Sequence, residues 1–241
     1  MFTGIIQSVA VITSVTDNKG IRTFDIEFKP GFCENLEIGA SVAVDGVCLT
    51  VTEIISPTRV TFDVMLKSLE ITTLSEYKQN QAVNVERAAK DGAEIGGHPL
   101  SGHVDFKTSV LDVQQIDENY RIRISLSRDW AKYIFPKGYI ALNGASLTVS
   151  DVNKNEGWFD VWLIPETRRM TTFEEKQSGS TINVEIERGT QVVVDTVRDA
   201  IDEKMGALMP LFEKFLASNN ADIESIGQAA QKALSDAEHK S

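Results

Sequence analysis

The 241-residue sequence has few cysteines and few histidines, and this limits its disulfide and metal chemistry. Two cysteines, Cys33 and Cys48, are too few for a disulfide framework in a chain of this length, so we expect free thiols. The three histidines are His98, His103 and His239, and neither a Cys-x-x-Cys nor a His-Glu-x-x-His spacing occurs. We therefore assign no zinc site and expect no metal.

Basic residues and long apolar runs are scarce as well. The chain has 24 Lys and Arg against 35 Asp and Glu, and its formal net charge is −11. Nucleic-acid binding relies on clustered basic side chains, so no nucleic-acid partner is expected. No run of about 18 apolar residues is present, and the first residues lack the basic-then-apolar pattern of a signal peptide. We expect a soluble, cytoplasmic protein with no membrane partner.

What the sequence does contain is an internal repeat. Residues 46–51 (GVCLTV) return as residues 144–149 (GASLTV), an offset of 98. Three further tripeptide pairs keep offsets of 98, 97 and 99: residues 2–4 with 100–102, residues 62–64 with 159–161, and residues 84–86 with 183–185. A period of this length is too long for a solenoid unit and fits a whole small domain. The repeat predicts a duplicated domain with two similar pockets.

Short β-rich runs dominate the first 190 residues. Asx-Gly pairs at residues 45–46 and 143–144 are hairpin signals between such runs. Runs typical of strands cover residues 8–12, 23–28, 41–44, 48–51, 60–64, 120–126, 139–142 and 158–163. We predict an all-β fold of two tandem homologous six-stranded antiparallel β-barrels followed by C-terminal helices. The expected boundaries are residues 1–97 for the first barrel, 98–190 for the second, and 191–241 for a helical segment and tail.

The pattern after residue 190 is helical. Apolar residues recur there at spacings of three and four: Val194, Val197, Ile201, Met205 and Leu208. We expect Pro210 to kink or end this helix and a second helical stretch to cover residues 223–237. An apolar stripe on a terminal helix either packs on its own domain or joins copies of the chain, and the pattern leaves both open.

The repeated hairpin carries candidate site residues. Positions i and i+2 of a strand share a face, so Cys48 lies beside Thr50 and, in the second copy, Ser146 lies beside Thr148. The intervening leucines face the opposite way. Polar strand residues that are satisfied locally would give the same pattern, but its recurrence in both copies favours a ligand. Cys48 taken alone is also consistent with a small buried side chain.

A glycine-rich joint lies between the copies at residues 91–98, and two histidines follow its glycines. Histidine exchanges protons near neutral pH, so His98 and His103 are candidate acids or bases. Their spacing of five does not place them on one strand face, which gives a shared metal little support. No helix pattern follows the glycines, so a dinucleotide-binding loop is rejected.

Together these motifs resemble the riboflavin synthase family, whose chains contain two lumazine-binding barrels. The resemblance is carried, in the family's order, by residues 1–5, 46–51, 96–103, 144–149 and 164–167. It implies that two molecules of 6,7-dimethyl-8-ribityllumazine exchange a four-carbon unit. One becomes riboflavin and the other 5-amino-6-ribitylamino-2,4-pyrimidinedione. No metal or organic cofactor is implied.

The resemblance also implies site residues. The polar groups assigned as catalytic, which are expected to face the substrate rings, are Cys48, His103, Lys137, Ser146 and Thr148. His103 is the expected proton-transfer residue, and Ser146 or Cys48 is the expected nucleophile or the residue that positions it. The wider substrate-binding set adds Phe2, Gly4, Ile5, Ile6, Leu49, Thr50, Asp63, Met65, Lys67, Ser68, Gly102, Val104, Leu147, Ile164, Pro165, Glu166 and Thr167.

The resemblance further implies an assembly. In the family, the active site forms between the first barrel of one subunit and the second barrel of its neighbour, within a homotrimer joined by C-terminal helices. Lumazine synthase is a further expected partner. Residues from 215 onward extend beyond the usual end of the family, and their role stays open.

Three residues depart from the family pattern. The first copy has Lys67 and Ser68 where the family tends to have Glu-Thr in both copies, and Glu187 stands where Asp is expected. The exchange of Glu for Lys67 puts equal activity of the two sites in question, and whether the lysine alters ring or ribityl binding in the first barrel stays open.

A rival interpretation is a non-catalytic lumazine- or flavin-binding antenna protein of bioluminescence. Such relatives tend to lose the second-copy Ser-Leu-Thr or the region of the two histidines, and both are intact here, which favours an enzyme. The flavin-binding half of a reductase is a third interpretation, but no nicotinamide-binding motif accompanies the barrels.

Overall fold

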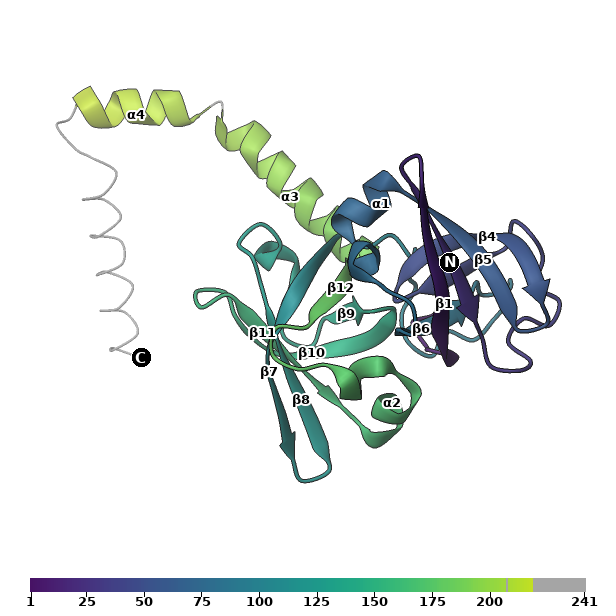
Figure 1. The fold of residues 1–241 in the computed structure, drawn as a ribbon. Helices are drawn as coiled ribbons and strands as arrows, with labels where there is room; N and C mark the ends of the chain where they lie inside the picture. Colours follow the sequence, from purple (N-terminus) through teal and green to yellow (C-terminus); the bar gives the residue numbers. More distant parts are fainter. Residues whose placement is uncertain (207, 219–241) are drawn as a thin grey trace. The chain divides into compact units, whose positions relative to one another are not determined.

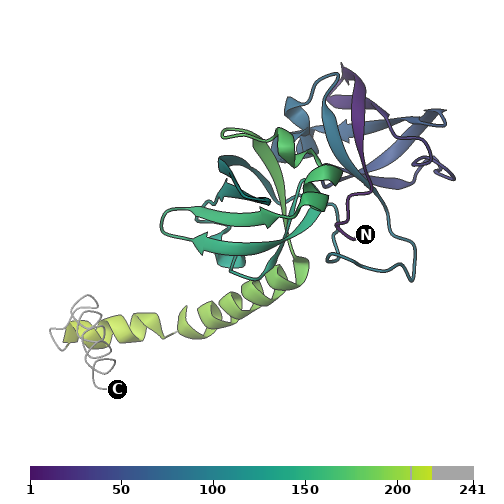
Figure 2. The same ribbon diagram turned by 90° about the horizontal axis from the view of Figure 1, so that it is seen from below.

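The computed structural model describes residues 1–206 and 208–218, and the described chain divides into two compact units between residues 191 and 192. The first unit contains two closed, six-stranded antiparallel barrels (Figures 1 and 2). The first barrel consists of β1 (Ser8–Asn18), β2 (Ile21–Glu27), β3 (Ser41–Val44), β4 (Val47–Ser56), β5 (Arg59–Met65) and β6 (Ala82–Arg87). The second consists of β7 (Phe106–Ile116), β8 (Asn119–Ser125), β9 (Tyr139–Leu142), β10 (Ala145–Asn153), β11 (Trp158–Leu163) and β12 (Thr181–Ile186). The predicted fold class is confirmed.

Both barrels have the same strand order. Around the first barrel the strands follow β1-β2-β5-β4-β3-β6, and around the second they follow β7-β8-β11-β10-β9-β12. Closure pairs every strand on both sides, so neither barrel has an open sheet edge. A short helix follows the fifth strand of each barrel, α1 (Leu66–Ile71) and α2 (Pro165–Met170), and each leads into a 3₁₀ turn (Thr73–Glu76 and Thr172–Glu175).

The Asx-Gly pairs form the tight turns that they predict. Asp45 and Gly46 have φ of 43° and 81°, and Asn143 and Gly144 have φ of 42° and 80°. Positive φ at both central residues is the geometry of the hairpin turn whose twist matches the flanking strands. The two turns also meet each other, because a Cβ on Gly46 would lie 2.7 Å from the backbone nitrogen of Gly144. Glycine is therefore required there for space as well as for φ.

Alternation along the strands builds the two cores. In β5, Val60, Phe62 and Val64 are buried while the residues between them face outward. Phe62 packs in the first core with Phe24 of β2, and Phe159 and Ile122 are fully buried in the second barrel. Burial of each such side chain contributes about 1.5–3 kcal/mol, which makes these cores the main stabilising element of each barrel.

One of the repeat pairs in the sequence is not a structural pair. Val51 pairs with Phe62, whereas its counterpart Val149 pairs with Val161, so the true offset in this strand is 99. Matching Phe62 to Phe159, an offset of 97, is therefore wrong by two residues. A shift of two keeps every side chain on the same face of a strand, so alternation alone could not reveal the error.

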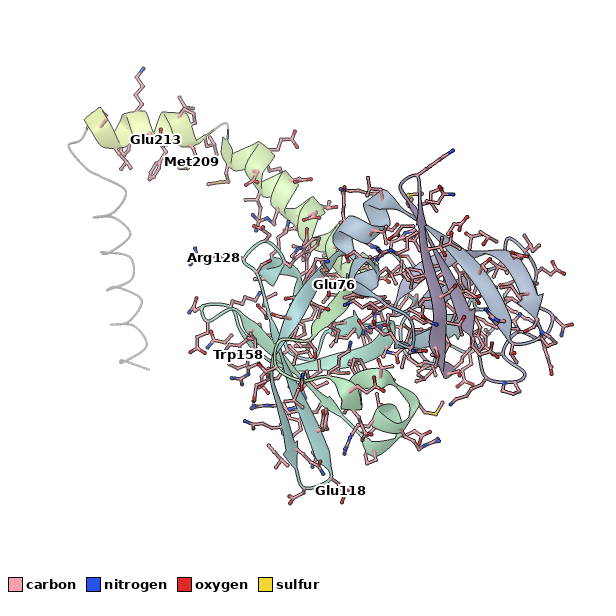
Figure 3. The ribbon with its side chains drawn as sticks, in the orientation of Figure 1. Glu76, Glu118, Arg128, Trp158, Met209 and Glu213 are labelled. Atoms are coloured by element: carbon pink, nitrogen blue, oxygen red, sulfur yellow. The ribbon has the colours of Figure 1, made fainter. Side chains whose placement is uncertain are left out.

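The barrels are joined to each other by reciprocal asparagine contacts. Asn84 of β6 accepts a hydrogen bond from the backbone of Thr172 (2.8 Å), and Asn183 of β12 accepts one from the backbone of Thr73 (2.8 Å). All four groups are buried. A further link is Glu76, labelled in Figure 3, which accepts from Lys107 (2.9 Å). Buried polar groups that are satisfied only across the junction favour a fixed arrangement of the two barrels.

Within the described part of the chain, two helices follow the barrels, α3 (Arg188–Gly206) and α4 (Met209–Ser218). The apolar residues Val197, Ile201 and Met205 of α3 are exposed. The prediction that Pro210 kinks or ends the first helix is wrong, because α3 ends at Gly206 and Pro210 lies in the first turn of α4. Proline is favoured in a first turn, where its missing N–H is not needed. The helical stretch predicted at residues 223–237 lies outside the described residues.

None of the described helices is long and apolar enough to cross a membrane. Both cysteines are free thiols, Cys33 buried in the first core and Cys48 partly exposed. The domain boundaries at residues 97 and 190 stay a prediction.

Candidate functional site

Each barrel is preceded by a short segment that pairs with the other barrel. Phe2 and Leu100 form an isolated bridge, with backbone hydrogen bonds of 2.8 and 3.0 Å between them. Two residues later, the carbonyl of Gly4 accepts from the amide of Ser146, and the carbonyl of Gly102 accepts from the amide of Cys48, both at 2.8 Å. The leading segment of the first barrel therefore lies against β10, and that of the second lies against β4.

Two buried glutamates hold these segments in place. Glu86 accepts from the amide and hydroxyl of Thr3 (2.6 and 2.7 Å) and from the amide of Gly4 (3.0 Å). Glu185 makes the corresponding three bonds to Ser101 and Gly102. Burial raises the pKa of both carboxyls above the ordinary value, although these hydrogen bonds oppose the shift. Their positions make them anchors of the segments that flank the hairpins.

A cavity of about 270 Å³ opens beside Ser146 in the second barrel. It is lined by Gly4, Ile5, Ile6, Ala145, Ser146, Glu166, Thr167, Met170 and Thr171. The lining therefore combines the N-terminal segment, the start of β10 and helix α2. Apolar walls with a few polar groups are typical of small-molecule sites, and the volume is near the lower end of their range.

A second cavity, of about 290 Å³, opens beside Cys48 in the first barrel. It is lined by Ile21, Cys48, Leu49, Thr50, Asp63, Val64, Met65 and Ser68. Because Cys48 and Ser146 occupy corresponding positions, the molecule has two related pockets, one for each barrel.

The expected face of each hairpin strand is observed. Cys48, Thr50, Ser146 and Thr148 are partly or fully exposed, while Leu49 and Leu147 are buried on the opposite face. The leucine side chains thus belong to the barrel cores, and a ligand at these positions would meet their backbone.

Several other predicted residues line neither of the two cavities. Lys137 is exposed. Its backbone amide donates a hydrogen bond to the carbonyl of Val149, the residue after Thr148 (2.8 Å). Its φ of 71° is unusual for lysine, and the first barrel has Gly39 at the corresponding turn. Phe2 and Val104 are buried, Ile164 and Lys67 are exposed, and Pro165 begins helix α2. Their functional roles stay predictions.

The structure separates the two candidate histidines. His103 is exposed and follows Gly102, and its carbonyl accepts from Arg188 (2.6 Å). His98 is buried, and its Nδ1 lies 2.6 Å from Ser146 Oγ. Burial lowers the pKa of His98, while the charge of Glu187 acts in the opposite direction. The sequence makes both histidines candidate acids or bases, and the family resemblance singles out His103 for proton transfer, whereas the histidine that contacts Ser146 is His98.

Ser146 is enclosed by glycines as well as by the histidine. A Cβ on Gly4 would lie 2.5 Å from Ser146 Cβ, and a Cβ on Gly97 would lie 2.9 Å from Ser146 Oγ. Side chains larger than hydrogen would displace the serine. On the Cys48 side, Gly102 makes the corresponding approach, at 2.6 Å from Cys48 Cβ.

The helices at the two pockets carry opposite ion pairs. Lys67 pairs with Glu70 on α1 (3.0 Å), and Glu166 pairs with Arg169 on α2 (2.6 Å). The acid and the base have exchanged places between the barrels. Arg169 lowers the pKa of Glu166, so the second pocket has a carboxylate at its rim where the first has an ammonium group nearby.

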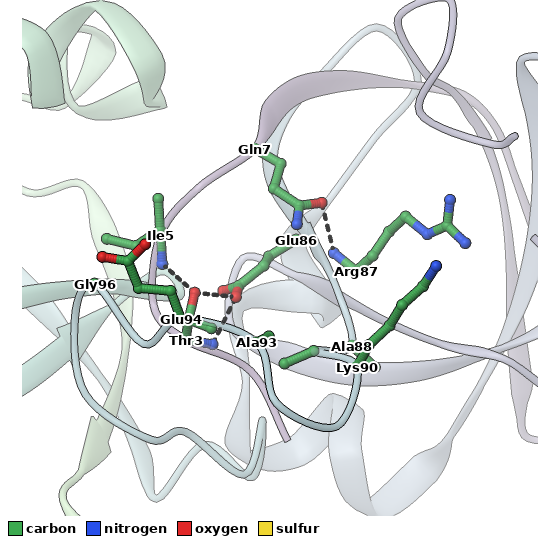
Figure 4. Close-up of a pocket in the computed structure, with 11 residues that line it drawn as sticks. Thr3, Ile5, Gln7, Glu86, Arg87, Ala88, Lys90, Ala93, Glu94 and Gly96 are labelled. Carbon is green, nitrogen blue, oxygen red and sulfur yellow. Dashed lines mark hydrogen bonds between the residues drawn. The ribbon is translucent and has the colours of Figure 1, made fainter.

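A further cavity, of about 560 Å³, adjoins the Ser146 pocket (Figure 4). It is bounded by the N-terminal segment, the end of β6 and residues 88–96 of the joint between the barrels. Figure 4 shows Glu86 directed toward Thr3, with its carboxylate already engaged by the hydrogen bonds described above. Ile5 lines both this cavity and the Ser146 pocket, so it forms part of the wall between them.

Comparison with known proteins gives a consistent picture. The model of the lumazine binding domain family matches residues 3–88 and 101–187. Riboflavin synthase of Escherichia coli (strain K12) is 42% identical over 209 residues, covering 86% of this chain and 97% of that protein. Riboflavin synthase of Chlamydia pneumoniae is 41% identical over 198 residues, covering 82% and 96%. A crystal structure of LumP complexed with riboflavin superposes with a TM-score of 0.71 at 26% identity, covering 78% of this chain and all of that one.

Proposed function

Because this chain belongs to the riboflavin synthase family, built from lumazine binding domains, we propose that it catalyses riboflavin formation from two molecules of 6,7-dimethyl-8-ribityllumazine. The observation that carries this proposal is the pair of related pockets, one beside Cys48 and one beside Ser146. A reaction whose donor and acceptor are the same compound needs two sites of similar shape. The duplicated barrel supplies them.

The reaction transfers a four-carbon unit from one lumazine to the other, and its atoms balance without an oxidant or a cofactor. It requires deprotonation of the 7-methyl group of one molecule and addition of a nucleophile at C7 of the other. It also requires the two rings to be held in register, and such positioning contributes several kcal/mol to rate acceleration. No resident metal or organic cofactor is part of the proposal.

The polar groups at the two pockets take the roles assigned above. Ser146 and Cys48 contact the rings and position or supply the nucleophile, and His103 transfers a proton. Thr148 and Lys137 contribute hydrogen bonds at the outer end of the second-barrel strand. The rest of the substrate-binding set surrounds the ring and ribityl chain.

A homotrimer brings the two kinds of pocket together in this proposal. In this proposal each pocket, of about 270 or 290 Å³, binds one substrate, and the donor and the acceptor meet from different pockets. The exposed apolar residues of α3 support association between copies of the chain, because burying them would stabilise an oligomer. Cytoplasmic location and association with lumazine synthase belong to the same proposal.

The test is to incubate purified protein with 6,7-dimethyl-8-ribityllumazine and separate the products by chromatography. We expect catalytic formation of riboflavin with one equivalent of pyrimidinedione. Tight lumazine binding without turnover would overturn the enzymatic proposal and support the antenna alternative, in keeping with the riboflavin-bound LumP structure.

A further inference from the structure

The Ser146–His98 contact has no counterpart at Cys48 among the described residues. Residues 1–97 contain no histidine, and no described histidine nitrogen is hydrogen-bonded to the thiol of Cys48. Cys48 therefore has the glycine neighbour of Ser146 but not its histidine. The two pockets share a backbone and differ in how the polar group at their centre is held.

We propose that His98 is a positioning residue that donates a hydrogen bond from Nδ1 to Ser146 Oγ and so directs the serine hydroxyl hydrogen into the second-barrel pocket. The ligand group that it serves is a hydrogen-bond acceptor on a heteroaromatic ring, a carbonyl oxygen or a ring nitrogen. This inference rests on the proposed function. The second-barrel pocket should therefore select more strongly than the first for a ligand ring that presents a hydrogen-bond acceptor to Ser146.

The ring of His98 is held in one orientation by its neighbours. It is 3% exposed and stacks on Tyr139, with 5.1 Å between ring centroids and 16° between the planes. Nδ1 lies 2.6 Å from Ser146 Oγ, a short hydrogen bond. A ring held on one face by stacking and at one edge by this bond does not rotate freely.

The surroundings of the His98 ring favour the neutral form with its proton on Nδ1. Nε2 of His98 is buried and has no hydrogen-bond partner among the described residues. A buried N–H without a partner is costly, and burial also disfavours the charged ring and lowers its pKa. The neutral ring with its proton on Nδ1 avoids both costs. In that form Nδ1 donates and Ser146 Oγ accepts.

The hydroxyl hydrogen of Ser146 is directed toward the second-barrel pocket. With His98 donating to Oγ, the hydroxyl hydrogen of Ser146 is free to be donated elsewhere. Gly4 and Gly97 close two sides of the serine, and the cavity beside it is the open side. The hydroxyl therefore acts toward the ligand as an oriented donor, and a preorganised donor of this kind needs no rearrangement when the ligand binds.

A double-mutant cycle on the full-length protein tests this coupling. His98→Phe keeps the stacking on Tyr139 and removes the donor, and Ser146→Ala removes the hydroxyl. We expect each single variant to weaken 6,7-dimethyl-8-ribityllumazine binding about tenfold, and the double variant to be no weaker than Ser146→Ala. His98→Asn, whose side-chain amide nitrogen can replace Nδ1, should restore most of the affinity. Additive losses, or no rescue by asparagine, would overturn the proposal.

A spectroscopic measurement tests the proton assignment independently of activity. In ¹⁵N-labelled protein at neutral pH, with His98 signals assigned by their loss in His98→Phe, we expect a protonated Nδ1 and an unprotonated Nε2. The opposite tautomer or a charged ring would overturn the proposal even if riboflavin is formed. A wild-type protein that binds lumazine but forms no riboflavin would end the proposed function, while the binding cycle and the tautomer would still decide the role of His98.

Discussion

The two barrels have the same strand order and the same tight turns, but they differ in three side-chain features. The second has Ser146 held by His98, whereas the first has Cys48. The ion pair at the pocket helix is reversed, and the first barrel has a buried Asp45–Tyr77 hydrogen bond where the second has Asn143. Duplication thus kept the backbone features that build a pocket, while the side chains that set its chemistry diverged.

The largest expected effect comes from the contact between the two hairpin turns. Gly46→Ala adds a Cβ 2.7 Å from the backbone of Gly144, at φ of 81°. We expect a loss of about 3–5 kcal/mol in unfolding free energy, or failure to fold, because backbone must move in both barrels. Chemical denaturation of the wild type and the variant measures this loss in unfolding free energy.

Gly20→Ala is the matched control. Its φ of 84° is similar, but nothing lies within 4 Å of the added Cβ. Only the left-handed strain of about 1–2 kcal/mol should remain. Equal losses in the two variants would show that the close approach of the turns contributes nothing.

The second prediction compares the pocket centres in catalysis. Ser146→Ala should reduce kcat/KM for riboflavin formation by about 100-fold, since it removes an oriented donor. Cys48→Ser should change it by less than about threefold, because the thiol has no histidine to orient it. Steady-state kinetics with 6,7-dimethyl-8-ribityllumazine measures both, and a larger loss in Cys48→Ser would reverse the assigned asymmetry.

The third prediction concerns the buried carboxyl of the first barrel. Burial raises the pKa of Asp45 from 3.8 to about 6, so its contribution to stability is fully present below pH 3.8 and is lost as the pH rises through 6. Asp45→Asn, which copies Asn143, should therefore stabilise the protein at pH 8 by up to about 3 kcal/mol and by little at pH 4. Thermal unfolding at the two pH values measures the difference, and an equal effect at both would contradict it.

The smallest expected effect comes from the reversed ion pair. The double variant Lys67→Glu/Glu70→Arg gives α1 the polarity of α2. The pair is exposed, so the unfolding midpoint should hardly change, while lumazine affinity in the first barrel should shift by a few fold. Titration calorimetry measures the affinity. Arg169→Lys, which keeps the charge at the second pocket, is the control and should leave both quantities unchanged.

The sequence was most informative where local chemistry determines the structure. The Asx-Gly pairs at Asp45 and Asn143 predicted the turns, and alternation placed Cys48 and Thr50 on the outer face correctly. Both signals act within a few residues, so they do not depend on the rest of the fold.

Long-range relationships were less accessible. A two-residue shift in β11 preserves the alternation of buried and exposed residues, so the sequence alone allows Phe62 to be matched with Phe159. The pairing of Val149 with Val161 shows that Val161 is the true counterpart of Phe62. The approach of His98 to Ser146 joins positions 48 residues apart and depends on how the joint folds over β10. Pro210 was assigned to the end of one helix and begins the next, because a proline marks both kinds of boundary in a sequence.

The most direct test of the account is the number and affinity of lumazine molecules bound per chain, measured by titration calorimetry in wild-type protein and in His98→Phe. We expect two sites per chain in the wild type, with only one of them weakened by the substitution. A single site per chain, or equal weakening of both sites, would contradict the view that the two barrels form related pockets with different chemistry.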